Sequence, residues 1–132
     1  MKKSAGIIIR DKQLLVLRSR GKNIFFAPGG KPEEGENPEE ALIRELREEI
    51  NIHVAAHDLR FFGNYQAPAA GYENVILNMD VYFVDGYQGQ ISPANEIEET
   101  RWVDSQSIAN VKVSSIFKEQ VLPALVDLAL VK

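Results

Sequence analysis

The chain has 132 residues, of which 45% are hydrophobic and 26% charged, a composition typical of one globular domain. A formal net charge of −4 argues against a protein that holds long nucleic acid, because neutralising many phosphates needs a basic surface. Without cysteine there is no disulfide framework and no thiolate metal site or nucleophile. The apolar run near the N-terminus is too short for a signal peptide, and no segment approaches membrane-spanning length. We therefore expect a cytoplasmic protein without membrane contact.

The first part of the chain predicts short strands and turns. Apolar runs at 6–9 and 13–17 indicate two strands, separated by the polar turn Arg10-Asp11-Lys12. A basic turn follows, and then Pro28-Gly29-Gly30, which we expect to break any regular element.

The clearest helix prediction begins at Asn37. Asn can cap a helix, and Pro38 is tolerated at the first helical position. Residues 41–49 are mostly strong helix formers, and Asn51 can end the helix in a left-handed conformation.

The second half returns to extended patterns and closes with an apolar helical stripe. No linker composition interrupts the chain, so we predict a single α+β domain over residues 1–132 with a mixed sheet. The expected elements are strands at 59–65, 75–84 and 101–103, a loop containing Pro68, an acidic loop at 91–100, a helical turn at 105–109 and a helix at 115–131 kinked by Pro123.

Three glutamates, Glu45, Glu48 and Glu49, share one side of the predicted helix, within an arc of about 100°. Like charges at this spacing each cost a few tenths of a kcal/mol in an isolated helix, so stability gives no reason to gather them. Mg²⁺ gives one, because it prefers carboxylate oxygens and bridges substrate phosphates. The alternative is a solvated acidic face.

The neighbours of these glutamates favour the metal interpretation. Arg44 lies one turn before Glu48 and can fix its rotamer. Just before the helix, Lys31 lies among glycines that let the backbone pass close to a ligand, and its amine can meet a phosphate. Taken alone, this loop is better explained as an ordinary turn.

Together, residues 30–52 resemble the box of the Nudix hydrolases. The family pattern is Gly, five residues, Glu, seven residues, Arg-Glu, an aliphatic, any residue, Glu-Glu, any residue, Gly, an aliphatic. The one departure is Asn51 in place of Gly, and Asn is the next-best residue for a left-handed helix end. The residues that match at the family spacing are Gly30, Glu36, Arg44, Glu45, Leu46, Glu48, Glu49 and Ile52.

The resemblance implies a Nudix fold, in which a mixed sheet is sandwiched between α-helices, and a set of site residues. By that carry-over, Arg44 orients the carboxylates and Glu36 and Gly30 have structural roles, with Glu36 bracing the loop against the helix. The ligands of Mg²⁺ or Mn²⁺ would be Glu45, Glu48, Glu49 and the carbonyl of Gly29.

The implied chemistry is attack of water on phosphorus, with a carboxylate that takes or positions the proton. In some members that base is the Glu at position 45, and in others it comes from a later loop. In MutT-type members a further metal-binding Glu lies six residues before the Trp that corresponds to Trp102, which places it at Glu96. Glu98 and Glu99 stay open as alternatives, as does a merely solvated loop.

Candidate substrate contacts outside the helix are Lys31, Arg18 and Phe26. Arg18 is a plausible phosphate contact, although a solvated turn explains it equally well. One of Phe25 and Phe26 should pack inward, which leaves the other to flank a base. His53 and His57 follow the predicted helix end, so their spacing is not that of a zinc pair on a helix.

The resemblance implies a small-molecule nucleotide substrate. The short chain and Glu96 favour a MutT-type enzyme, which cuts a nucleoside triphosphate to monophosphate and pyrophosphate. The Asn that reads oxidised guanine in that group should fall near 113–115, where there is none, and Asn110 is the nearest. Pro68 has the spacing of the ADP-ribose pyrophosphatase marker, which keeps ADP-ribose or a nucleoside diphosphate sugar as an alternative.

A non-catalytic nucleotide-binding Nudix module is a third reading, disfavoured because every box carboxylate is present. Nudix enzymes often form homodimers, so the resemblance is compatible with a homodimer.

Overall fold

The computed structural model describes residues 1–69 and 71–132. In this part of the chain no helix is long and apolar enough to cross a membrane. Single 3-10 turns lie at Ala56–Asp58 and Ser107–Asn110, and a π-helical turn at Phe117–Val121 leads into the last helix. The strands and helices are β1 (Lys2–Ile7), β2 (Ile9–Arg10), β3 (Gln13–Ser19), β4 (Phe25–Phe26), β5 (Gly29–Gly30), α1 (Pro38–Ile50), β6 (Leu59–Pro68), β7 (Ile76–Val84), β8 (Ile97–Val103) and α2 (Leu122–Asp127).

The strands form two small sheets that meet where β1 leads into β2. The first has the order β5-β1-β7-β6 and is mixed, because β1 and β7 run parallel and the other pairs antiparallel. The second is antiparallel and is built on β3, which pairs with β2, β4 and β8. The β2–β3 hairpin turns at Asp11 and Lys12, both with positive φ, as the polar turn predicted.

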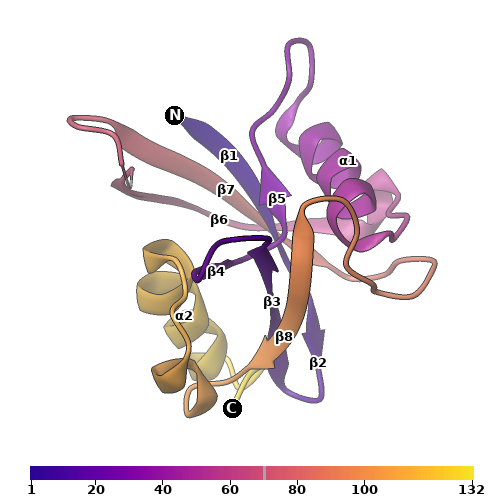
Figure 1. Ribbon diagram of the computed structural model, residues 1–132. Coiled ribbons are helices and arrows are strands. Elements are labelled where there is room, and N and C mark those ends of the chain that lie inside the picture. Colours follow the sequence, from indigo (N-terminus) through magenta and orange to yellow (C-terminus); the bar gives the residue numbers. More distant parts are fainter. Residues whose placement is uncertain (70) are drawn as a thin grey trace.

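Two hydrophobic cores lie on opposite faces of the sheets, because side chains alternate along each strand. Val81 and Phe83 of β7 belong to the core around the C-terminal helical segment, whereas Tyr82 and Val84 belong to the core under α1. Figure 1 shows α1 and α2 on opposite sides of the strands. The expected α+β fold, with mixed strands between helices, is confirmed.

Helix α1 begins and ends where its sequence predicts. Asn37 accepts a hydrogen bond from the backbone N–H of Glu40 at 2.8 Å, and the Glu40 carboxylate accepts one from the N–H of Asn37 at 3.0 Å. Asn51 ends the helix with φ 61° and ψ 34°. The apolar face is fully buried at Leu42 and Leu46, each worth about 2 kcal/mol in burial. Glu49 lies on this same buried face and Glu45 borders it, whereas Glu48 lies further round the helix and is exposed.

The prediction that Pro28-Gly29-Gly30 breaks regular structure was wrong. Gly29 and Gly30 form β5, paired with Ala5 and Ser4 of β1. Gly29 has φ 142°, and a Cβ at this position would lie 2.0 Å from the carbonyl oxygen of Ser4. The glycines therefore allow a close strand pairing that any other residue would obstruct.

Three boundaries also differ from the prediction. Residues 97–100 belong to β8 and not to an acidic loop, because they pair with β3. Strand β6 extends to Pro68, a residue tolerated there because it is the last of a strand at the sheet edge. The C-terminal helix ends at Asp127, and a π-helical turn precedes Pro123, which lacks the N–H that a regular helix would need.

Candidate active site

Glu49 of α1 is a carboxyl group buried beside the glycine strand. It is 3% exposed, and its Oε1 accepts a hydrogen bond from the N–H of Gly29 at 2.9 Å. Burial, together with the negative charges of Glu45, Glu96 and Glu48, raises the pKa of Glu49 to about 9. The Gly29 hydrogen bond acts in the opposite direction without cancelling burial. Without a cation beside it, Glu49 therefore keeps its proton at neutral pH.

Glu45 lies one turn earlier and rests against the same strand. A Cβ on Gly30 would stand 2.7 Å from the Glu45 carboxyl carbon, so the helix approaches β5 as closely as it does because Gly30 has no side chain. Burial raises the pKa of Glu45, and the charges of Glu48 and Glu96 add to this, while Arg44 opposes it.

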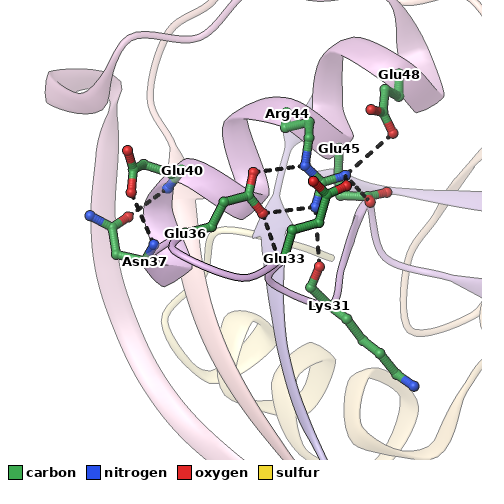
Figure 2. A network of polar contacts seen from close by, with 8 residues as sticks. All are labelled: Lys31, Glu33, Glu36, Asn37, Glu40, Arg44, Glu45 and Glu48. Atoms are coloured by element: carbon green, nitrogen blue, oxygen red, sulfur yellow. Dashed lines mark hydrogen bonds and ion pairs between the residues drawn. The ribbon is translucent and has the colours of Figure 1, made fainter.

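Arg44 is the centre of a polar network that joins the loop to the helix (Figure 2). Its Nε and Nη2 donate to the two carboxylate oxygens of Glu36 at 2.8 and 3.0 Å. Its Nη1 donates to Glu45 at 2.7 Å and, more weakly, to Glu48 at 3.4 Å. The Nη2 also donates to the carbonyl of Lys31 at 3.1 Å. One guanidinium thus holds two glutamates of the helix and both ends of the loop.

Glu36 occupies the bracing position that the family pattern implies. The hydrogen bonds from Arg44 hold the pKa of Glu36 below its ordinary value, and a hydrogen bond from the N–H of Glu33 at 2.8 Å adds to this effect. The Lys31 side chain points away from this network (Figure 2), and its Nζ lies 5.9 Å from the ring centre of Tyr72.

The segment before β8 brings Glu96 toward the helix. The N–H of Ala94 donates to the carbonyl of Glu49 at 3.0 Å, which ties this segment to the end of α1. The charge of Glu96 raises the pKa values of both Glu45 and Glu49, so its carboxylate is near enough to act on both. Of the three candidates in this segment, Glu96 is the one that the structure places with the helix glutamates.

Glu98 and Glu99 are engaged elsewhere. Arg18 contacts Glu98 at 3.5 Å and Glu99 at 3.2 Å, and Glu99 also pairs with Arg101 at 2.7 Å. Arg101 and then Arg18 hold the pKa of Glu99 below its ordinary value. Arg18 is therefore held by carboxylates in this arrangement, and its contact with substrate stays a prediction.

The donor set fits a hard divalent cation. Within residues 1–69 and 71–132 no three His, Asp or Glu side chains stand in a metal-holding arrangement. Two of the box carboxylates have other partners here, since Glu45 bonds to Arg44 and Glu49 to the N–H of Gly29. The charges of Glu45, Glu48 and Glu96 nonetheless act on Glu49, and carboxylate oxygens are the donors that Mg²⁺ and Mn²⁺ take. The carbonyl of Gly29 stays a predicted ligand.

A cavity of about 590 Å³ begins at the glycine strand. Gly29 and Gly30 form part of its wall, so the cavity adjoins the two glycines that Glu49 and Glu45 contact. Phe26 also lines it, while its neighbour Phe25 is 5% exposed and packs in the core. This is the division between the two phenylalanines that the sequence predicts. Pro68 lies in the wall as well.

Four further residues at this site were not predicted. Lys3, Lys112 and Lys118 line the cavity, and Ser4 is 1% exposed with a hydroxyl that has no hydrogen-bond partner among the described residues. Only Lys3 carries a sequence signal, because strand alternation places it on the same face as Ala5. The other two lysines are brought in by the fold of the C-terminal segment.

Comparison with known proteins agrees with this geometry. A family model described as NUDIX domain matches residues 1–125. The 8-oxo-dGTP diphosphatase of Haemophilus influenzae is 33% identical over 110 residues, covering 80% of this chain and 76% of that protein. The ADP-ribose pyrophosphatase of Methanocaldococcus jannaschii is 27% identical over 106 residues, covering 78% of this chain and 61% of that protein.

Among solved structures, that of the E. coli ORF135 protein superposes with a TM-score of 0.76 at 24% identity, covering 97% of this chain and 89% of that one. This likeness supports the fold, and the family match over nearly the whole chain supports the relationship in sequence. The chain therefore belongs to the Nudix domain family and is a Nudix hydrolase.

Proposed function

We propose that this protein hydrolyses a nucleoside triphosphate to the monophosphate and pyrophosphate with Mg²⁺ or Mn²⁺. The observation that carries the proposal is the position of the glycine strand. Gly29 and Gly30 touch the carboxylates of α1 on one side and line the 590 Å³ cavity on the other. A substrate seated across them places its phosphates beside Glu45, Glu48 and Glu49, and its nucleoside in the cavity.

Phosphates and carboxylates repel each other, so this placement requires a cation between them. Glu45, Glu48 and Glu49 are the residues that would hold it, with Glu96 as a further ligand. The bound Mg²⁺ or Mn²⁺ supplies neutralisation of the phosphate oxygens in the transition state. The raised pKa values of Glu45 and Glu49 support this assignment, since a bound cation would stabilise the charged forms that burial disfavours.

The remaining roles follow from the hydrogen bonds. Arg44 positions Glu45 and Glu48, and is itself fixed by two hydrogen bonds to Glu36. The proton of the attacking water goes to Glu45 or to Glu96. Glu45 is held in one orientation by Arg44, whereas Glu96 is exposed on a loop and free to turn toward the phosphate. Lys31 stands at the start of the loop, where its amine can meet a phosphate oxygen.

The relatives support a triphosphate substrate, because the Haemophilus influenzae protein named 8-oxo-dGTP diphosphatase aligns over most of both chains. Specificity for oxidised guanine is a separate question. Residues 113–115 do line the cavity, as expected for base-reading positions, but they are Val113, Ser114 and Ser115. We therefore assign a triphosphate without assigning its base.

ADP-ribose, or a related nucleoside diphosphate sugar, is the second candidate. Pro68 and Tyr72 lie in the cavity wall, where the sugar beyond the diphosphate would rest. The Methanocaldococcus jannaschii relative is named as an ADP-ribose pyrophosphatase.

The test is hydrolysis of a panel of nucleotides, with the four deoxynucleoside triphosphates, 8-oxo-dGTP, ADP-ribose and UDP-glucose. Products separated by ion exchange should show a monophosphate and pyrophosphate from at least one triphosphate, with Mg²⁺ and not with EDTA. Release of inorganic phosphate in place of pyrophosphate, or turnover of ADP-ribose alone, would contradict the triphosphate proposal. A matched pair of variants identifies the site, since Glu48→Gln should lose the activity and Glu34→Gln, an exposed glutamate of the preceding loop, should keep it.

A further inference from the structure

The cavity next to the glycine strand is positively charged, although the whole chain is acidic. Three lysines, Lys3, Lys112 and Lys118, line it, and Glu119 is its one acidic lining residue among those the structure describes. Lys31 adds a further positive charge nearby, because its Nζ lies 5.9 Å from the ring centre of Tyr72, another lining residue. A net positive cavity in a chain with a net charge of −4 indicates a ligand that is itself anionic there.

The backbones of the three lysines are held by a strand or by hydrogen bonds, and their amines have no ion-pair partner among the described residues. Lys3 lies in β1, the carbonyl of Lys112 accepts from the N–H of Phe25 at 2.7 Å, and the N–H of Lys118 donates to Ser114 at 3.0 Å. Over residues 1–69 and 71–132 none of the three lysines forms an ion pair with the protein.

Some arginines of the same chain do bond to carboxylates, among them Arg18, Arg60 and Arg101. The three cavity lysines have no such partner among the residues that the structure describes, so their charge is available to a ligand.

The phosphates at the scissile bond do not account for these lysines. Those phosphates would lie beside α1, which packs on one face of the sheets. Lys112 precedes and Lys118 lies within the C-terminal helical segment, which packs on the opposite face around Phe117 and Val121. Lys3 points to that same face, since it alternates with Ser4 along β1. The three amines therefore meet a different part of the ligand.

The rest of the cavity wall accommodates a flat apolar ring. Phe26, Leu77 and Met79 contribute apolar side chains, which suit a neutral base but give no role to the lysines. We propose that the nucleoside half of the substrate carries a second anionic group, a phosphate on its ribose, and that Lys3, Lys112 and Lys118 select for it. This inference rests on the proposed function, which seats the nucleoside in the cavity, and it names the class of nucleotide that the site selects.

The test compares nucleotides that differ by one ribose phosphate and needs no turnover. Calorimetry with Mg²⁺ present measures the dissociation constants of adenosine 5′-monophosphate, adenosine 3′,5′-bisphosphate and adenosine 2′,5′-bisphosphate, and of the guanosine counterparts. At least one bisphosphate should bind at least about tenfold more tightly than its monophosphate at low salt. The preference should shrink at about 0.5 M salt, because the lysines are accessible to screening ions.

The matched variants show whether the lysines cause the preference. The triple variant Lys3→Gln, Lys112→Gln, Lys118→Gln should bring the ratio of affinities to within about twofold, and Lys112→Gln alone should lower it in part. Lys2→Gln is the control, because Lys2 is the neighbour of Lys3 on β1, is exposed, and faces the other side of the sheet. It should leave the ratio unchanged.

Equal affinities for mono- and bisphosphates in the native chain would overturn the inference, as would a preference that survives in the folded triple variant. Either result leaves the proposed hydrolysis standing if the nucleotide panel is still cut. Conversely, a lysine-dependent bisphosphate preference in a protein that cuts neither the panel nor nucleoside 5′-triphosphates bearing a 2′- or 3′-phosphate would overturn the proposed function and not the lysine site.

Discussion

Replacing Glu49 by glutamine should stabilise the metal-free protein, and more so as the pH rises. Glu49 is 3% exposed, and its pKa is raised from the ordinary 4.5 to about 9, first by burial. A carboxyl group with a raised pKa keeps its proton in the folded state while the unfolded chain releases it. The folded state therefore becomes less stable as the pH climbs from about 5 toward 9.

The size of the effect follows from linkage. One proton held only by the folded state lowers the free energy of unfolding by about 1.4 kcal/mol for each pH unit in this interval. Between pH 6 and pH 8 the native protein in EDTA should lose about 2–3 kcal/mol through Glu49, an upper value because the pKa of the neighbouring Glu45 is also raised and the two groups titrate together. Glutamine has no proton to lose and can still accept the hydrogen bond from Gly29.

The assay is urea unfolding in EDTA at pH 6, 7 and 8, followed by the fluorescence of Trp102, the single tryptophan. The Glu49→Gln curve should be nearly flat with pH, and Glu34→Gln, the exposed control, should follow the native slope. Excess Mg²⁺ at pH 8 should stabilise the native protein and have little effect on Glu49→Gln, because a cation binds only the folded carboxylates. Parallel pH dependence in the native protein and Glu49→Gln would refute the reasoning.

Three further substitutions test the site. Glu48→Gln should lower kcat by at least about 100-fold while the melting temperature stays close to native, because it removes a metal ligand from an exposed position; near-native turnover would reassign the site. Arg44→Lys should cost about 1–3 kcal/mol in urea unfolding and about 10- to 100-fold in kcat, since a lysine cannot bond Glu36 twice and Glu45 at once; unchanged values of both would remove its positioning role. Glu96→Ala should sharply reduce turnover of a triphosphate while Pro68→Ala does little, whereas an ADP-ribose enzyme should show a changed KM for ADP-ribose in Pro68→Ala; no change in either variant would place specificity elsewhere.

The helix that carries the site could be predicted because its determinants are local. Asn37 and Asn51 mark its ends by capping chemistry, and the spacing of the box glutamates is fixed by the helical repeat. Strand β5 could not be predicted, since Gly29 and Gly30 have no strand propensity and pair only because β1 comes close enough to exclude a side chain. Pro28, which precedes this strand, also favours a turn by its own propensity and so pointed to a break in regular structure.

The acidic composition of 97–100 concealed the start of β8. Glu98 and Glu99 read as loop residues, yet both pair with Arg18 on the neighbouring strand β3. Cross-strand ion pairs of this kind depend on a partner about 80 positions away, which local pattern does not reveal. The same limit applies to the cavity, because Lys112 and Lys118 meet Lys3 only in the folded chain.

The central claim is that the carboxylates of α1 hold a divalent cation beside the phosphates of the substrate. Electron paramagnetic resonance of added Mn²⁺ tests this most directly, because it counts free and bound ion without requiring turnover. The native protein should bind Mn²⁺, more tightly when a non-hydrolysable triphosphate is present, and the variant Glu45→Gln, Glu48→Gln, Glu49→Gln should bind none while remaining folded. Equal binding of Mn²⁺ by the native protein and by this variant would contradict the account.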